Sequence, residues 1–162
     1  MERNERVMAK YWYMIKDPGV RLWNLSSWDR LTRVLTGMGF EWWDQDLEAI
    51  PASGSVLIVR GDYLFDERVL HTLGQEKNAV FQVVRTARVI PVAAHVEAVK
   101  GKEILTFMQE ERLPETPAYR MMQLEDLSSG FSQTLIKSKA PSILPIRTDK
   151  RENLEEQLFC SS

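Results

Sequence analysis

The chain has 162 residues, 44% of them hydrophobic and 27% charged, a composition typical of one ordinary globular domain. Its net charge of -2 does not favour a nucleic-acid-binding protein, which normally carries a basic face or tail. The single cysteine, Cys160, excludes an intrachain disulfide framework, and with two histidines it does not make a zinc site. The N-terminus is charged throughout, unlike a secretory signal, and no stretch approaches the roughly 18 apolar residues that span a membrane. We therefore expect a soluble, cytoplasmic domain.

The first part of the chain predicts a strand, a turn and a capped helix. Residues 10–16, KYWYMIK, are aromatic and apolar, as in a strand. Asp17-Pro18-Gly19 is strong turn chemistry. A helix begins at Ser26 or Ser27 and runs to Met38, and an acidic residue three positions after Ser26 forms a partial capping box.

The next segment predicts a buried strand followed by a second helix. Residues 40–43 indicate a short strand and residues 44–54 a loop. Residues 55–59 form an apolar run of strand length, the pattern of a strand covered on both faces. Asp66 then caps a helix that Gly74 ends.

The remainder of the chain continues the alternation of strands and helices. Residues 78–84 and 88–96 predict two strands, and residues 97–112 have partly helical spacing. Further helices are expected to begin at Asp126 and Asp149. Strands that alternate with helices favour a single α/β domain over the whole chain, a three-layer sandwich with a mainly parallel sheet.

The end of the buried strand is the first candidate ligand site. Ligands of open parallel sheets bind beyond the carboxyl ends of the strands, where Gly61 and Asp62 would lie. A carboxylate there can bind a divalent metal or a ribose hydroxyl, and a glycine lets a ligand approach the backbone closely. The alternative is a plain strand-to-helix turn with Asp62 exposed, which the spacing alone favours.

The turn after the first strand is a second candidate. Lys16, Asp17 and Arg21 flank it, and the cations could neutralise a phosphate beside the positive end of the following helix. The loop has only Gly19, however, so it matches neither the Walker pattern nor a dinucleotide fingerprint. A solvated turn is the favoured alternative.

Other chemistry-bearing residues are expected to be structural. The five tryptophans are interpreted as core and edge residues, although a base-stacking platform or a partner surface around Trp42-Trp43 is also open. His95 follows an apolar strand, as core histidines do. Ser26 and Ser27 are better caps than nucleophiles, and Cys160 has no activating neighbourhood.

The order of the elements resembles the sugar-nucleotidyltransferase family. In that family a phosphate loop follows the first strand, and the next helix is similar to residues 25–39, LSSWDRLTRVLTGMG. A later strand ends in an "nGDvlFd" segment, which residues 60–66, RGDYLFD, resemble closely. The aspartate of that segment holds metal and nucleotide, so the resemblance assigns Mg²⁺ and a nucleotide to Asp62. This implies a reduced, Rossmann-like nucleotidyltransferase fold.

More specifically, the chain resembles the cytosolic N-terminal domain of bifunctional membrane proteins that carry a CDP-alcohol phosphatidyltransferase. Inositol-1-phosphate cytidylyltransferase/di-myo-inositol phosphate phosphate synthases are the characterised type. The likeness is carried by "RLWNLSSWDRL", "IPVAAHV" and the tail "SILPIRTDKRENLEEQLFCSS". It implies a CTP- or CDP-type nucleotide with phosphates near Lys16 and Arg21. It also implies that residues 141–162 lead to a membrane domain, which would place this chain at the inner face of the membrane.

The phosphate loop departs from the pattern of the family. Residues 16–25 read KDPGVRLWNL, with one glycine and no GxGxR, and only Arg21 loosely matches the arginine of that loop. We therefore expect a degenerate domain, for which binding without turnover or no binding at all is favoured over catalysis. An active relative would let a sugar or polyol phosphate attack the nucleotide α-phosphate, with metal and cations stabilising the charge. The alternative is a non-catalytic regulatory or interaction module that forms homodimers through its tryptophans.

Overall fold

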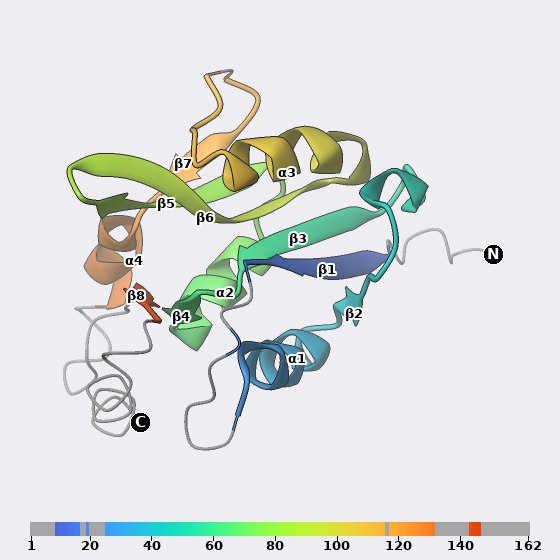
Figure 1. The fold of residues 1–162 in the computed structure, drawn as a ribbon, viewed down its shortest axis with the longest axis horizontal. Coiled ribbons are helices and arrows are strands. Elements are labelled where there is room, and N and C mark those ends of the chain that lie inside the picture. The colour runs from blue at the N-terminus through green and yellow to red at the C-terminus, as the bar shows by residue number, and fades with distance from the viewer. Residues whose placement is uncertain (1–8, 17–18, 20–24, 116, 132–142, 147–162) are drawn as a thin grey trace.

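A six-stranded sheet organises the part of the chain that the computed structural model describes, namely residues 9–16, 19, 25–115, 117–131 and 143–146. The strand order is β2-β1-β3-β6-β5-β7 (Figure 1). The bounds are Lys10–Ile15 for β1, Glu41–Trp42 for β2, Ser55–Arg60 for β3, Ala79–Arg85 for β5, Arg88–Glu97 for β6 and Arg120–Met122 for β7. A separate two-stranded sheet pairs β4 (Tyr63–Phe65) with β8 (Ile143–Pro145).

The sheet is mainly parallel, with one reversed strand among those described. β1 pairs in parallel with β2 and β3, and β5 pairs in parallel with β7, whereas β6 runs antiparallel to both β3 and β5. The reversal follows from a two-residue turn between β5 and β6, in which Thr86 and Ala87 have φ values of 53° and 63°. Positive φ at both central residues matches the twist of a tight hairpin, which must return antiparallel.

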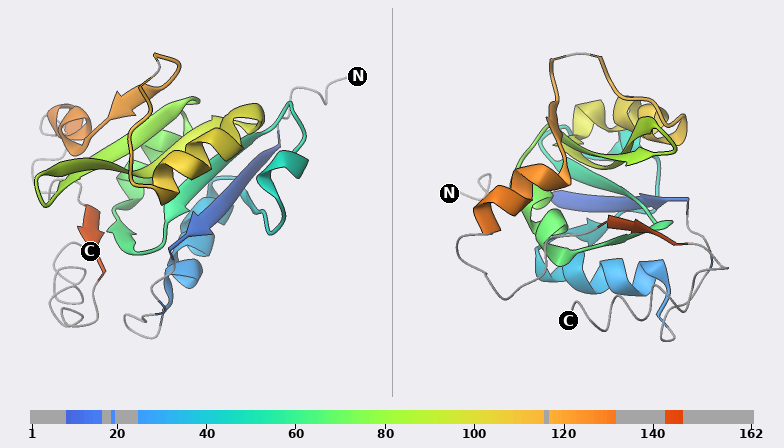
Figure 2. Two further views of the ribbon diagram at one scale, coloured as in Figure 1. Left: turned by 45° about the horizontal axis from the view of Figure 1, so that its top comes forward. Right: turned by 90° about the vertical axis from the view of Figure 1, so that its left-hand side faces the viewer.

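Helices cover both faces of the sheet and give three layers (Figure 2). One face is covered by α1, α2 and α4, the other by α3 and two short 3-10 helices, η2 and η3. The bounds are Ser27–Gly37 for α1, Glu67–Gly74 for α2, Gly101–Gln109 for α3, Leu124–Phe131 for α4, Leu47–Ala49 for η2 and Ala98–Lys100 for η3. The predicted α/β sandwich with a mainly parallel sheet is confirmed at this level.

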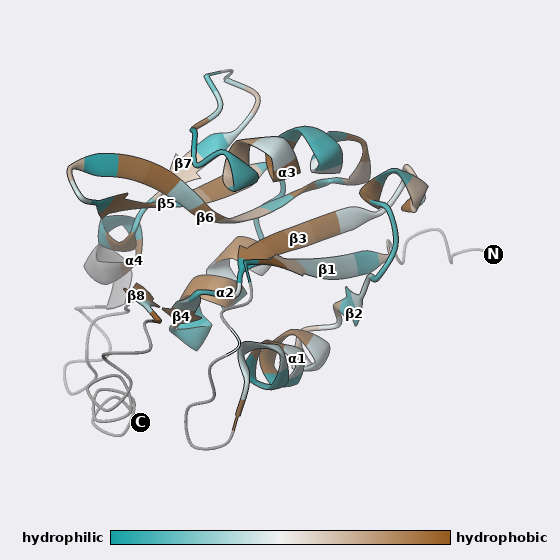
Figure 3. Ribbon diagram, in the orientation of Figure 1, coloured by the Kyte–Doolittle hydropathy of each residue, from teal (hydrophilic) through white to brown (hydrophobic). Residues whose placement is uncertain are grey.

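Strand β3 lies inside this sandwich and is buried along its whole length, which Figure 3 shows as a mostly hydrophobic ribbon. Leu57 and Val59 pack in the core that contains α1 and α2, while Val56 and Ile58 pack in the core that contains α3. Because side chains alternate with a period of two, Arg60 extends the row of Val56 and Ile58 on the α3 face.

The caps predicted for α1 and α2 are confirmed. The Ser26 side chain accepts a hydrogen bond from Asp29 N–H, and the Asp29 carboxylate accepts one from Ser26 N–H, which completes the capping box. The Asp66 side chain caps α2 by accepting from Arg68 N–H.

The prediction that Asp126 caps the start of a helix was wrong by three positions. Helix α4 already starts at Leu124, and the Asp126 carboxylate reaches back to accept from Gln123 N–H. An acidic residue at the third helical position resembles a cap in sequence because both positions favour carboxylates. The helix predicted from Asp149 lies outside the described residues. No helix among the described residues is long and apolar enough to cross a membrane.

Candidate functional site

The Gly61-Asp62 turn joins the ends of several elements at the carboxyl edge of β3. Gly61 N–H donates to the carbonyl of Ile15 at the end of β1, at 2.7 Å. The Ser27 hydroxyl, in the first turn of α1, donates to the Gly61 carbonyl at 2.6 Å. The Asp62 carbonyl accepts from Ile146 N–H, at 2.8 Å. Three hydrogen bonds from different segments therefore fix the backbone of this turn. A nucleotide contact through the backbone of Gly61 stays a prediction.

Asp62 is paired with the buried side chain of Arg60. Nε of Arg60 donates to Oδ1 of Asp62 at 2.9 Å, and Nη2 donates to Oδ2 at 2.6 Å. This is the two-bond geometry in which guanidinium and carboxylate interact most strongly. Arg60 is 2% exposed and Asp62 23% exposed. The predicted ligand residue Asp62 therefore also neutralises a buried cation.

Arg60 has a second acidic partner, Glu111, 51 residues further along the chain. Nη1 of Arg60 donates to Oε2 of Glu111 at 2.8 Å, and the guanidinium lies 5.1 Å from the centre of the Tyr63 ring. Burial lowers the pKa of Arg60, but the hydrogen bonds and charges of Asp62 and Glu111 outweigh it and raise that pKa above its ordinary value. A buried arginine needs such partners, because an unpaired charge is costly inside a protein.

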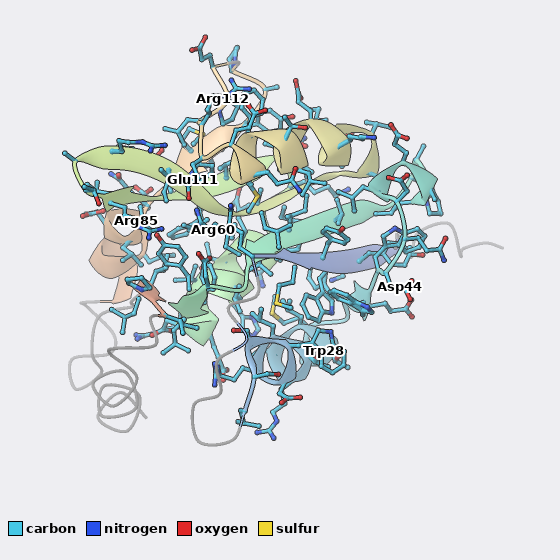
Figure 4. The ribbon with its side chains drawn as sticks, in the orientation of Figure 1. Trp28, Asp44, Arg60, Arg85, Glu111 and Arg112 are labelled. Carbon is cyan, nitrogen blue, oxygen red and sulfur yellow. The ribbon has the colours of Figure 1, made fainter. Side chains whose placement is uncertain are left out.

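Glu111 also interacts with other cations at the same edge. Its carbonyl accepts from Nη2 of Arg88 at 2.9 Å, and its carboxylate lies 3.9 Å from that group. The hydrogen bond from Arg60 is the largest cause that lowers the pKa of Glu111, and the charges of Arg60, Lys16 and Arg85 lower it further. Arg85 also donates to the hydroxyl of Tyr63 at 3.4 Å. Figure 4 shows Arg60 and Glu111 close together, with Arg85 further to the left at the end of β5.

Four cations from different segments of the described chain come together at this edge. Lys16 follows β1, Arg60 ends β3, Arg85 ends β5 and Arg88 begins β6. Against these four cations stand the carboxylates of Asp62 and Glu111. Cations gathered at the mouth of the sheet suit an anionic ligand such as a phosphate.

The structure brings only some of the predicted site residues together. Lys16, Gly61 and Asp62 lie at the carboxyl edge of β1 and β3, but Asp17 and Arg21 fall outside the described residues. Arg60, Arg85, Arg88 and Glu111 were missed. One signal for Arg60 was present, since an arginine that directly extends an apolar strand must find a partner. The others come together only through strand order.

The described residues contain no group of three or more histidine, cysteine or acidic side chains that could hold a metal ion. Asp62 alone would contribute one carboxylate. Magnesium is commonly bound by one or two carboxylates together with substrate phosphates and waters. Each Asp62 oxygen already accepts from Arg60, but a carboxylate oxygen has two acceptor positions. Asp62 thus fits an ion that arrives with phosphates better than a resident ion.

His95 is a satisfied core residue, as predicted. It is 2% exposed, with Nδ1 lying 3.0 Å from the Leu73 carbonyl and Nε2 lying 2.9 Å from the Ser55 hydroxyl. Because a carbonyl can only accept, Nδ1 carries the proton and Nε2 accepts from Ser55. Burial lowers the pKa of His95 to about 4, so the ring is neutral at pH 7.

Several tryptophans form an aromatic cluster away from Arg60. Trp12 is fully buried, whereas Trp28 and Trp42 are 38% and 37% exposed. The ring centres of Trp12 and Trp42 lie 4.6 Å apart, and those of Trp28 and Trp42 lie 6.2 Å apart. Trp28 is separated from Arg60 in Figure 4. Trp12 is therefore a core residue, while Trp28 and Trp42 leave a partner surface open.

No protein-family model matches the chain, and no curated protein matches it.

Proposed function

We propose that this chain is a degenerate nucleotidyltransferase-like domain that binds a CTP- or CDP-type nucleotide and does not turn it over. The observation that supports this most is the position of Asp62. It follows a strand buried on both faces, at the carboxyl edge of a mainly parallel sheet, with the start of α1 bound to the preceding Gly61. Ligands of open α/β sheets bind at this edge.

The charge of the edge supports a phosphate-bearing ligand. Lys16, Arg60, Arg85 and Arg88 come from four different segments and surround two carboxylates. Nucleotide phosphates would gain charge-assisted hydrogen bonds from these donors. Magnesium that arrives with the nucleotide would bind Asp62 and neutralise phosphate charge.

Binding is proposed rather than catalysis because of the loop after β1. Residues 16–25 contain one glycine and lack the glycine-rich, arginine-containing pattern of the nucleotidyltransferase family that the sequence resembles. The nucleotidyltransferase reaction relies on positioning and charge stabilisation at the α-phosphate, which that loop supplies in the family. Release of pyrophosphate from CTP in the presence of inositol phosphate or other sugar phosphates would contradict a degenerate domain.

The wider context of the domain is proposed from the resemblance alone. A CDP-alcohol phosphotransferase polypeptide would place this domain on the cytoplasmic side of the membrane. Within the predicted connection of residues 141–162, β8 belongs to this domain, so the connection itself would follow Ile146. The sequence of the gene beyond Ser162 tests this: several apolar helices are expected there. A stop codon directly after Ser162 would contradict it.

Nucleotide binding is tested by thermal unfolding and tryptophan fluorescence with CTP, CDP and cytidine, each with and without Mg²⁺. A ligand at one hundred times its Kd stabilises a protein by about 2.7 kcal/mol, which is roughly 5–10 °C in Tm for a domain of this size. CTP and CDP are expected to raise Tm and cytidine is not. No shift at millimolar CTP would refute the proposal.

The matched variants are Asp62→Asn and Glu48→Gln. Asp62→Asn keeps an acceptor for Arg60 but removes the charge, so it should weaken the Mg²⁺-dependent part of binding. Glu48 is 64% exposed and pairs with Lys102, so Glu48→Gln removes an acid elsewhere. Asp62→Asn that leaves the Mg²⁺-dependent part of binding equal to that of Glu48→Gln would contradict a role for Asp62 in holding the ion.

Self-association is the second candidate function, and the exposed aromatic residues favour it. Trp42 lies on β2, an edge strand of the sheet, and contacts Trp28. Tryptophan is enriched in interfaces, and an edge strand offers unpaired backbone groups. Sedimentation velocity should show a concentration-dependent dimer that Trp42→Gln weakens. Val84→Gln, at another exposed apolar residue, is the control. A wild-type chain that stays monomeric at 100 μM (roughly one hundred times a Kd of about 1 μM) would contradict this candidate.

A further inference from the structure

Glu111 lies at the centre of the cations described above. It accepts from Nη1 of Arg60 at 2.8 Å, and it is 29% exposed where Arg60 is 2% exposed. Asp62 uses the Nε and Nη2 side of the guanidinium, so Glu111 covers the remaining side. An anion from solvent that reaches Nη1 must therefore take the place of the Glu111 carboxylate.

The backbone of Glu111 has an unfavourable conformation. Its φ is 57°, and the bonds from Glu111 N–H to the Met108 carbonyl and from Arg112 N–H to the Phe107 carbonyl form the motif that usually ends a helix with glycine. A side chain in this left-handed conformation costs about 1 kcal/mol. The chain bears this cost and gains the pairing with Arg60.

Left-handed residues other than glycine gather around the site. The described residues contain five of them, of which four belong to segments that border this edge, namely Lys16, Thr86, Ala87 and Glu111. Residues held in sparsely populated backbone regions cluster at ligand-binding and switch regions, because the surrounding structure must hold them there. Lys16 and Glu111 are thus themselves held in defined backbone conformations, and the hairpin turn at Thr86 and Ala87 fixes the positions of Arg85 and Arg88.

We infer that the Glu111 carboxylate occupies the place of a nucleotide phosphate and is displaced when the nucleotide binds to Arg60, Arg85 and Arg88. This rests on the proposed function and deepens it, because it locates the phosphate and identifies an internal competitor. Asp62 keeps its two bonds to Arg60 during the exchange, so the buried charge stays paired. A phosphate offers three acceptor oxygens where Glu111 offers two.

The inference is tested by isothermal titration of the full chain with CTP, inorganic pyrophosphate and cytidine. Glu111→Gln removes the competing charge and should bind CTP and pyrophosphate about tenfold more tightly than the wild type, which corresponds to about 1.4 kcal/mol. Arg88→Gln should weaken both several-fold and make binding less sensitive to salt. Cytidine, which carries no phosphate, should respond to neither change.

Glu110→Gln is the matched control. Glu110 is adjacent in sequence, 52% exposed and paired with Arg112, so its loss changes net charge equally but leaves Arg60 untouched. Affinity for CTP should stay at the wild-type value. Glu111→Gly replaces Glu111→Gln if the latter does not fold, because glycine suits the backbone at this position.

The outcomes separate the inference from the function on which it rests. If the wild type binds CTP and Glu111→Gln binds it with equal or lower affinity, the inference is overturned but the proposed function is not. Failure of the wild type and of Glu111→Gln to bind CTP at millimolar concentration would overturn both. An equal gain in Glu110→Gln would also overturn the inference, because it would show a general charge effect.

Discussion

Replacing the buried Arg60 tests the account of the site most directly. Arg60→Met keeps the length and apolar stem of the side chain but removes the charge that Asp62 and Glu111 neutralise. Removing one member of a buried ion pair costs about 3–5 kcal/mol, because the remaining charges lose their partner. Asp62 and Glu111 are 23% and 29% exposed, so water compensates them in part and the lower value, about 3 kcal/mol, is expected.

Urea unfolding followed by tryptophan fluorescence measures this loss. With a slope of about 2 kcal/mol per molar urea, the midpoint should fall by about 1.5 M. A drop of this size is a large part of the roughly 5–15 kcal/mol by which domains are stable.

The triple variant Arg60→Met, Asp62→Asn, Glu111→Gln is the control for this experiment. It removes the orphaned carboxylates as well, so it should be more stable than Arg60→Met alone. A loss below about 0.5 kcal/mol in Arg60→Met, typical of a surface change, would refute the reasoning. A triple variant no more stable than the single one would refute it as well.

Two further predictions concern residues outside the site. Burial lowers the pKa of His95 to about 4 from its ordinary 6.5, so the unfolded chain binds the proton more tightly than the folded chain. The neutral ring therefore makes its full contribution to the free energy of unfolding above about pH 6.5. This contribution to the free energy of unfolding should be lost as the pH falls from 6.5 towards 4, by about 3 kcal/mol in total at 1.36 kcal/mol per pH unit. In the urea assay, the midpoint of His95→Asn should therefore change less with pH between about 6.5 and 4.5 than the midpoint of the wild type. An equal slope in both proteins would contradict a neutral buried ring. Ser26→Ala should cost about 1 kcal/mol in the same urea assay through loss of the α1 cap, whereas Thr36→Ala, an exposed position in the same helix, should cost little.

Local features of this protein were predictable because their causes lie within a few residues. The cap of α1 depends on Ser26 and Asp29, three positions apart, and the cap of α2 on Asp66 beside its own helix. The burial of β3 follows from its unbroken apolar run. The location of Asp62 at a strand end followed from the same pattern, since a glycine and an acid directly after a buried strand must lie at its edge.

The chemistry of the site was decided by contacts between distant residues. Arg60 and Glu111 are 51 positions apart and meet only because α3 returns over the face of β3 on which Arg60 lies. Arg85 and Arg88 reach the same edge because the hairpin at Thr86 and Ala87 reverses β6. Hydrophobic periodicity and capping residues act between residues a few positions apart, so they determine where the helices and strands form. Which charges meet depends on strand order and direction, which only the packed sheet determines.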